Sequence, residues 1–184
     1  MSVAWVMLQL VRTFLAIPLV LLLACTAATV TVTGDRRAPV SPSPSSASNA
    51  RKALATVTRV VDGDTAHVLF RGRDVTVRFI GVDTPETVAP GQPIECYGPA
   101  ASHFTTRQLT GRRIRLEFDV DRIDPFGRTL AYSWMRDGSM FNETLVRRGF
   151  ATVATYPPDT RYVQRFETAQ RAAKAAERGL WGAC

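Results

Sequence analysis

Charge is nearly absent from the start of this 184-residue chain. Between Met1 and Val32 only Arg12 is charged, and a dense apolar run extends from Phe14 to Ala24. This pattern is typical of a bacterial export signal. Because the apolar character continues to Val32, the segment is also long enough to span a bilayer as an uncleaved anchor. We therefore interpret residues 1–32 as an export signal, a lipoprotein signal or a membrane anchor.

Cysteine is scarce, with three residues in the chain. Cys25 follows Leu22-Leu23-Ala24 at the end of the apolar run, and this segment resembles the lipobox of bacterial lipoproteins. In that case Cys25 becomes the lipidated N-terminus, whereas ordinary cleavage further on and retention of the segment are the alternatives. The sequence thus predicts an exported protein that is a cell-envelope lipoprotein, membrane-anchored or secreted.

The other two cysteines are Cys96 and Cys184. In an exported domain an even pair in an oxidising compartment is expected to form a disulfide. Such a bridge would tie the C-terminus to the start of a predicted helix. Two buried free thiols are the alternative.

Histidine is scarcer still. His67 and His103 are isolated in the sequence, and neither has a partner at metal-ligand spacing. Packing is therefore the favoured interpretation of both, and a histidine-based metal site is not expected. No internal repeat is visible either, so we expect one folded domain.

Acidic residues are the minority. The chain has 23 Lys and Arg against 16 Asp and Glu, and from Arg51 onward the numbers are 20 and 15. A basic surface attracts polyanions such as nucleic acids. Many exported bacterial proteins are basic without binding nucleic acid, so charge alone does not decide the function.

The chain changes character twice before its globular part begins. Residues 33–50 are rich in Pro, Ser, Gly and Ala, which predicts a flexible linker. Residues 51–184 form the predicted domain. Its β-rich runs are Leu54–Val61, Thr65–Phe70, Asp74–Ile80, Arg112–Phe118 and Arg128–Trp134; its predicted helices are Pro99–Thr110, Met140–Arg148 and Arg161–Arg178, the last ended by Gly179; and a long loop covers Gly81–Cys96.

Five strands in a three-plus-two order, with a helix between the third and fourth, are typical of the OB barrel. The sequence therefore predicts an α+β, mainly β fold: a five-stranded OB-fold barrel with three packed helices. OB barrels bind oligonucleotides, oligosaccharides and proteins alike, so the fold names no function.

Four short motifs are more specific. In order along the chain they are Val61-Asp62-Gly63-Asp64-Thr65, Arg78 with Val82-Asp83-Thr84-Pro85-Glu86-Thr87, Tyr97-Gly98-Pro99, and Gly127-Arg128-Thr129-Leu130-Ala131-Tyr132. Each is weak alone, since Asp-Gly-Asp is a common turn. Together, over about Leu54 to Trp181, they strongly resemble staphylococcal nuclease.

The resemblance implies a calcium site. Asp64 and Asp83 would be direct ligands, with the backbone carbonyl of Thr84 as a third and Asp62 in the surrounding layer. Hard carboxylate and carbonyl oxygens suit Ca²⁺, and such an ion can neutralise phosphate and activate water. Without the other motifs, a hairpin turn would be the favoured interpretation of Asp62 and Asp64.

The resemblance also assigns the remaining chemistry. Arg78 and Arg128 would clamp the phosphate with planar guanidinium groups and stabilise charge in the transition state. Glu86 would act as general base, or order water and the loop by hydrogen bonding. The implied activity is a calcium-dependent endonuclease acting on DNA and RNA and leaving 3′-phosphate ends.

The nucleotide-facing positions depart from the family pattern. The family has Lys and Tyr before the Gly-Arg pair, whereas this chain has Pro125 and Phe126. Phe126 can stack on a base but cannot donate a hydrogen bond. Tyr156 is a candidate for one of two further aromatic contacts, in a segment shorter than in the family.

Two other functions are compatible with parts of the sequence. One is an exported nucleic-acid-binding OB module without catalysis, and the other is a structural or adhesive envelope lipoprotein. Catalysis is favoured because a binding module has no chemical need for Asp64, Arg78, Asp83, Glu86 and Arg128 together. A monomer is expected.

Overall fold

A computed structural model describes residues 52–87, 91 and 93–184. The expected export segment 1–32, the expected linker 33–50 and the candidate lipidation site Cys25 lie outside the described residues. Within the described part, no helix has the length and apolar character that a membrane span requires.

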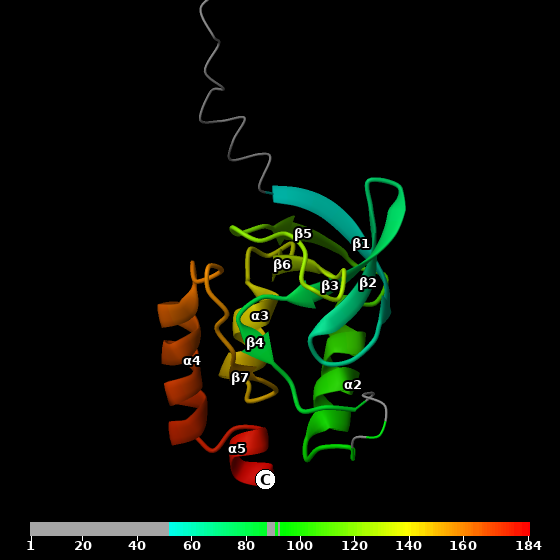
Figure 1. The fold of residues 1–184 in the computed structure, drawn as a ribbon. Coiled ribbons are helices and arrows are strands. Elements are labelled where there is room, and N and C mark those ends of the chain that lie inside the picture. Colours follow the sequence, from blue (N-terminus) through cyan, green and yellow to red (C-terminus); the bar gives the residue numbers. More distant parts are fainter. Residues whose placement is uncertain (1–51, 88–90, 92) are drawn as a thin grey trace, which may run out of the picture. The chain divides into compact units, whose positions relative to one another are not determined.

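Five strands close into a barrel (Figure 1). They are β1 (Lys52–Val60), β2 (Thr65–Phe70), β3 (Arg73–Phe79), β5 (Arg113–Glu117) and β6 (Thr129–Trp134). The order around the barrel is β1-β2-β3-β6-β5, and every pair is antiparallel except β3 with β6, which is parallel. The predicted five-stranded OB barrel is therefore confirmed.

The barrel interior is filled by small and branched apolar side chains. Inward positions alternate with exposed or half-buried ones, as the pleat of a strand requires. The fully buried residues include Val57, Val68, Val77, Leu116 and Ala131. The hairpin between β2 and β3 turns at Arg71 and Gly72, both of which have positive φ.

Two short strands were not predicted. β4 (Val82–Asp83) lies inside the stretch that the sequence assigned to a loop from Gly81 to Cys96. It pairs antiparallel with β7 (Thr152–Val153), which lies between two predicted helices. A two-residue pairing is too short to produce a visible periodicity, which explains the omission. Its consequence for the site is direct, because it fixes Asp83 opposite Thr152.

The sharp turn between β3 and β4 needs glycine at position 81. Gly81 has a φ of +80°, and a Cβ there would lie 2.4 Å from the ring of Phe166. The turn therefore packs directly on helix α4 (Val163–Ala175), which carries Phe166.

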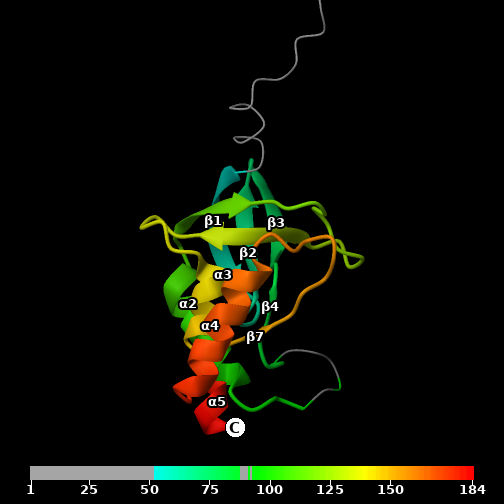
Figure 2. The same cartoon turned by 90° about the vertical axis from the view of Figure 1, so that its left-hand side faces the viewer.

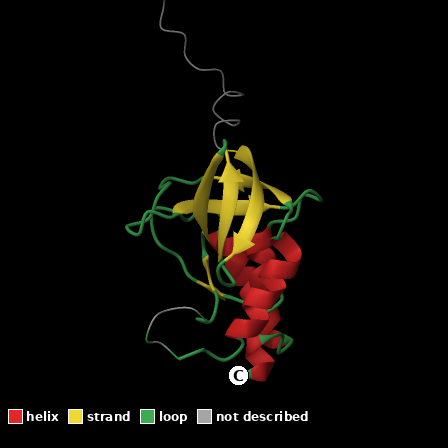
Figure 3. Ribbon diagram, turned by 90° about the vertical axis from the view of Figure 1, so that its right-hand side faces the viewer, coloured by secondary structure: helices red, strands yellow, loops and turns green. Residues whose placement is uncertain are grey.

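The helices are α2 (Gly98–Leu109), α3 (Phe141–Arg147), α4 and α5 (Leu180–Ala183). The three predicted helices are present, but the last covers Val163–Ala175 rather than Arg161–Arg178. Gly179 instead precedes the short α5. Figure 2 shows α3 and α4 side by side, and Figure 3 shows the helices gathered at one end of the barrel.

A buried amide joins α3 to the barrel. Asn142 is fully buried, and its Oδ1 accepts a hydrogen bond from the amide of Ser133 in β6 at 2.8 Å. Its Nδ2 donates to the carbonyl of Ile80, just after β3, at 2.9 Å. One side chain thus satisfies backbone groups beside two strands.

A disulfide joins Cys96 to Cys184, with an S–S distance of 2.10 Å. It links the segment before α2 to the end of α5, which is the pairing expected from the cysteine count. The loop that follows β4 is therefore covalently held to the C-terminal helices.

Replacing Asn142 by alanine should lower the free energy of unfolding by about 3 kcal/mol. The substitution leaves the Ser133 amide and the Ile80 carbonyl buried without this partner, and each such group costs about 1–3 kcal/mol. Denaturant unfolding followed by circular dichroism measures the change. Gln164→Ala, on the exposed face of α4, is the control and should change stability by less than about 0.5 kcal/mol; equal effects of the two variants would contradict the assignment.

Candidate active site

The predicted catalytic residues converge on one small cavity of about 140 Å³. The turn after β1, the end of β3, β4 with the following loop, and the start of β6 all contribute to its wall. Its lining residues are Asp62, Asp64, Arg78, Asp83, Thr84, Pro85, Glu86 and Arg128. The fold thus brings together residues separated by more than sixty positions in the sequence.

Asp64 is the buried centre of this cavity, with 4% of its surface exposed. Its Oδ2 accepts hydrogen bonds from the amide of Thr84 at 2.7 Å and from the Thr84 hydroxyl at 2.9 Å. Its Oδ1 accepts from the Thr65 hydroxyl at 3.1 Å. One carboxylate oxygen is therefore fixed on the segment that follows β4, and the other is held by the first residue of β2.

The turn that carries Asp64 has little room. A Cβ on Gly63 would lie 2.6 Å from the side chain of Thr84. The carbonyl of Gly63 accepts a hydrogen bond from the Thr105 hydroxyl of α2 at 2.6 Å, in a buried position. Glycine at position 63 therefore lets the turn and the β4 segment approach closely.

Asp62 supports the same turn, since its Oδ1 accepts a hydrogen bond from the amide of Asp64 at 3.1 Å. Burial, and after it the negative charge of Asp64, raises the pKa of Asp62 to about 6. The raised pKa therefore reflects mainly the burial of this carboxyl group, to which the nearby charge of Asp64 adds.

Arg78 lies between the two candidate metal-binding carboxylates. Its Nη1 is 3.1 Å from Asp64 Oδ1, and its Nη2 is 2.7 Å from Asp83 Oδ1. Nη1 also donates to the carbonyl of Val82 at 2.7 Å. Burial raises the pKa of Asp83, an effect that the nearby Arg78 opposes.

The side chain of Arg128 is oriented by Asp124. Its Nε donates to Asp124 Oδ2 at 2.6 Å, and its backbone amide donates to Asp124 Oδ1 at 2.8 Å. Burial acts to raise the pKa of Asp124, but these hydrogen bonds outweigh it and hold that pKa below its ordinary value. Because Nε is engaged, the two terminal nitrogens of Arg128 are the ones available to a ligand.

Glu86 lies on a loop in which hydrogen bonds join its backbone to Glu95. Its amide donates to Glu95 Oε2 at 2.9 Å, and its carbonyl accepts from the amide of Glu95 at 2.9 Å. Its own Oε1 accepts from the amide of Thr87 at 2.7 Å. The carboxylate is thereby held at the cavity that Asp83 and Asp64 also line.

The carboxylate and carbonyl oxygen atoms at this cavity are ligands that suit a hard divalent cation. Asp64, Asp83 and the carbonyl-bearing Thr84 line one wall, and carboxylate and carbonyl oxygens are the ligands that Ca²⁺ prefers. In the described part of the chain, no three His, Cys, Asp or Glu side chains group closely enough to hold a metal ion. A bound ion would therefore take two carboxylates and complete its shell with a backbone carbonyl, water or substrate.

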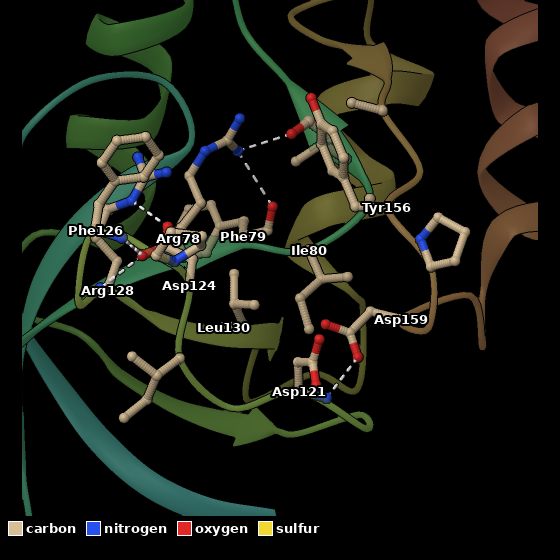
Figure 4. Close-up of a pocket in the computed structure, with 16 residues that line it drawn as sticks. Arg78, Phe79, Ile80, Asp121, Asp124, Phe126, Arg128, Leu130, Tyr156 and Asp159 are labelled. Carbon is tan, nitrogen blue, oxygen red and sulfur yellow. Dashed lines mark hydrogen bonds and ion pairs between the residues drawn. The ribbon is translucent and has the colours of Figure 1, made fainter.

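A larger cavity of about 480 Å³ adjoins the first and shares Arg78 and Arg128 with it (Figure 4). Apolar side chains, including Ile80 and Leu130, form its floor. The two predicted aromatic contacts, Phe126 and Tyr156, line it and are 83% and 71% exposed. The guanidinium of Arg128 lies 5.3 Å from the ring centre of Phe126.

Comparison with known proteins agrees with this geometry. The family described as staphylococcal nuclease homologue matches residues 76–183. Thermonuclease of Staphylococcus intermedius is 48% identical over 125 residues, covering 68% of this chain and 74% of the relative. Thermonuclease of Staphylococcus hyicus is 46% identical over 134 residues, covering 73% and 79%. Endonuclease YncB of Bacillus subtilis is 40% identical over 135 residues, covering 71% and 64%.

The chain belongs to the staphylococcal nuclease family. The family match includes Arg78, Asp83, Glu86 and Arg128, and the small cavity joins these four to Asp64 from the preceding turn. The resemblance inferred from the four motifs is therefore confirmed.

Sequence reasoning did not identify the residues that hold the site of this family member in place. Asp124 orients Arg128, and the only signal for it was an acidic residue four positions before an arginine. Thr105 lies in the middle of α2 and carried no signal at all, because its bond to Gly63 spans 42 positions of sequence. Such partners become visible only when the fold brings them together.

Asp124→Asn should lower kcat/KM for nucleic-acid cleavage by up to about a hundredfold, because small displacements of a positioned group can cost that much. The asparagine oxygen can still accept the two backbone hydrogen bonds, whereas its amide cannot pair with Arg128 Nε. Asp137→Asn is the matched control, since Asp137 also accepts a hydrogen bond from the backbone amide two residues later but is exposed. An unchanged rate in Asp124→Asn would contradict the positioning role.

Proposed function

We propose that this nuclease is calcium-dependent and cuts single-stranded DNA and RNA internally, leaving 3′-phosphate ends. The supporting observation is the small cavity, in which two carboxylates, Glu86 and two arginines meet. The relatives named thermonuclease and endonuclease support the reaction class. An OB module that only binds nucleic acid would not require this combination of side chains.

Asp64 and Asp83 would hold the calcium ion, with the carbonyl of Thr84 as a third protein ligand. When bound, such an ion supplies positive charge to the phosphate and lowers the pKa of water. Asp62 supports Asp64 from behind through the hydrogen bond to its amide. The double hydrogen bond from Thr84 orients Asp64 before any ligand arrives.

Arg78 and Arg128 would bind the scissile phosphate from the edge shared by both cavities. The two terminal nitrogens of Arg128 can donate parallel hydrogen bonds to phosphate oxygens, whereas those of Arg78 also contact Asp64, Asp83 and the Val82 carbonyl. Their charge opposes the negative charge that increases on the phosphoryl group in the transition state. Arg78 also keeps the carboxylates of Asp64 and Asp83 from repelling each other, since it contacts both.

Glu86 would act on the attacking water. Its loop position on the cavity places a carboxylate near the proposed metal ligands, where it can accept a proton or orient water by hydrogen bonding. Attack on phosphorus then releases the 5′ oxygen and leaves phosphate on the 3′ side.

The larger cavity would hold the nucleoside next to the scissile phosphate. Exposed Phe126 and Tyr156 offer flat faces on which bases can stack, a contact that tolerates any base. Pro125 and Phe126 offer no side-chain donor there, so the affinity for the nucleotide would rest on stacking and on the two arginines. The basic charge of the domain, 20 against 15 from Arg51 onward, favours a polyanionic substrate.

The protein would work outside the cytoplasm as a monomer. The Cys96–Cys184 disulfide is typical of an oxidising compartment. The apolar start of the sequence would direct export, with a lipid on Cys25 or the retained segment as the membrane attachment.

Cleavage of a single-stranded oligonucleotide should require millimolar calcium and should stop when a chelator is added. The reason is that two carboxylates and a carbonyl at the cavity need a cation to bind phosphate rather than repel it. Gel analysis of end-labelled DNA and RNA measures the cuts and the phosphate at the new 3′ ends. Absence of cleavage with calcium at alkaline pH would refute the proposal.

Arg128→Lys should lose roughly a hundredfold or more in kcat and far less in substrate binding. A lysine keeps the charge but cannot form the two-pronged contact that stabilises the transition state. Single-turnover rates and binding titrations separate the two effects. Arg112→Lys, at an exposed position outside both cavities, is the control, and equal losses of rate and binding in Arg128→Lys would count against the clamp.

A further inference from the structure

The larger cavity contains a carboxylate that the proposed chemistry does not use. Asp159 lines this cavity and is 6% exposed. Its Oδ1 accepts hydrogen bonds from the amides of Val120 and Asp121, both at 2.9 Å. In the part of the chain that the structure describes, no group donates a hydrogen bond to its Oδ2.

Asp159 lies across the cavity from the phosphate-binding side. In Figure 4, Arg78, Arg128 and Phe126 occupy one side, whereas Asp159 and Asp121 lie on the other with apolar Ile80 and Leu130 between them. The Asp159 carboxylate is directed inward, toward this apolar floor. A ligand with phosphate at one end and a hydrogen-bond donor at the other matches this arrangement.

Among the described residues, no basic side chain forms an ion pair with Asp159, and two backbone amides are its hydrogen-bond partners. Asp119 and Asp121 are its acidic neighbours, and the nearby Arg161 is engaged with Asp119 and Glu117. Burial, with the help of the two neighbouring negative charges, raises the pKa of Asp159 despite the amides that hydrogen-bond to it. Oδ2 is not among the side-chain atoms of the described residues that are fully buried without a partner, so water can reach it, and a hydrogen-bond donor on a ligand in the cavity would replace that water.

We propose that Asp159 determines base specificity by accepting a hydrogen bond from the exocyclic amino group of a nucleobase in the larger cavity. Cytosine, adenine and guanine carry such an amino group, and aspartate is a natural acceptor for cytosine N4. Thymine and uracil carry a carbonyl oxygen where cytosine carries its amino group, and a carboxylate repels that oxygen; the N3–H beside it is the one donor on their Watson–Crick edge. The inference rests on the proposed function in one respect, namely that this cavity holds the base.

The orientation of the base follows from two fixed points. Arg78 and Arg128 hold the phosphate at the edge shared with the small cavity, and Phe126 or Tyr156 stacks on the ring. The Watson–Crick edge then extends toward the far wall, where Asp159 lies (Figure 4). Stacking gives affinity for any base, whereas the Asp159 carboxylate discriminates between bases.

Asp159→Asn is the decisive variant, because it keeps one oxygen for the amides of Val120 and Asp121. The other oxygen becomes an amide nitrogen, so a hydrogen-bond donor replaces the acceptor in the cavity. Wild-type protein should cleave oligodeoxycytidine roughly five- to tenfold faster in kcat/KM than oligothymidine of equal length. The variant should lose or reverse this ratio, with an unchanged melting temperature.

Asp121→Asn is the matched control. It removes the same charge from the wall of the same cavity, but Asp121 is exposed, and the base preference should persist. The inference would be overturned if Asp121→Asn also lost the preference for oligodeoxycytidine over oligothymidine. It would equally be overturned if wild type and Asp159→Asn showed the same ratio of kcat/KM on the two substrates.

Binding separates this inference from the proposed catalytic function. Calorimetric titration with deoxycytidine and thymidine 5′-monophosphates, in calcium, requires no cleavage. Preference for the cytidine nucleotide that Asp159→Asn abolishes supports the inference even if no cutting occurs. Failure to bind either nucleotide, or equal affinity for both, overturns it even in an active nuclease.

Discussion

The hydrogen bonds of one buried carboxylate, Asp64, hold the active site together. A buried charge without partners costs several kcal/mol, so the fold must supply them. Thr84 supplies two, Thr65 a third and Arg78 an ion pair, from three separate segments of the chain. The contacts that make burial of Asp64 tolerable are therefore the same contacts that set the distance between the β1–β2 turn, β3 and the β4 loop.

The two arginines are also oriented before a ligand arrives, because other protein groups already bind part of each guanidinium. Asp124 takes the Nε of Arg128, and the Val82 carbonyl takes part of Arg78. A long, flexible side chain loses conformational entropy when it binds a ligand. Here much of that cost is met during folding, so a phosphate meets guanidinium groups that are already oriented.

The sequence predicted well what depends on local pattern. The five barrel strands, three helices and turn residues such as Gly63 follow from alternation, capping signals and Asp-Gly-Asp. The four motifs identified the family and led to the residues of the small cavity. The sequence failed where contacts are long-range or very short: the β4–β7 pair has two residues on each side, and Asn142, Thr105 and Asp159 bond to backbone groups from 9 to 62 positions away.

The two cavities are fixed by largely independent sets of interactions. Asp64 organises the small one, whereas the wall of the larger one depends on Arg161, which binds Asp119 and Glu117, and on Asp159, which binds the segment at Val120. Of the described residues, only Arg78 and Arg128 belong to both. Changes such as Pro125-Phe126 can therefore alter the fit of a nucleoside while the carboxylates and the guanidinium clamp keep their geometry. A barrel built in this way can change which base it accepts without rebuilding the groups that cut the phosphodiester.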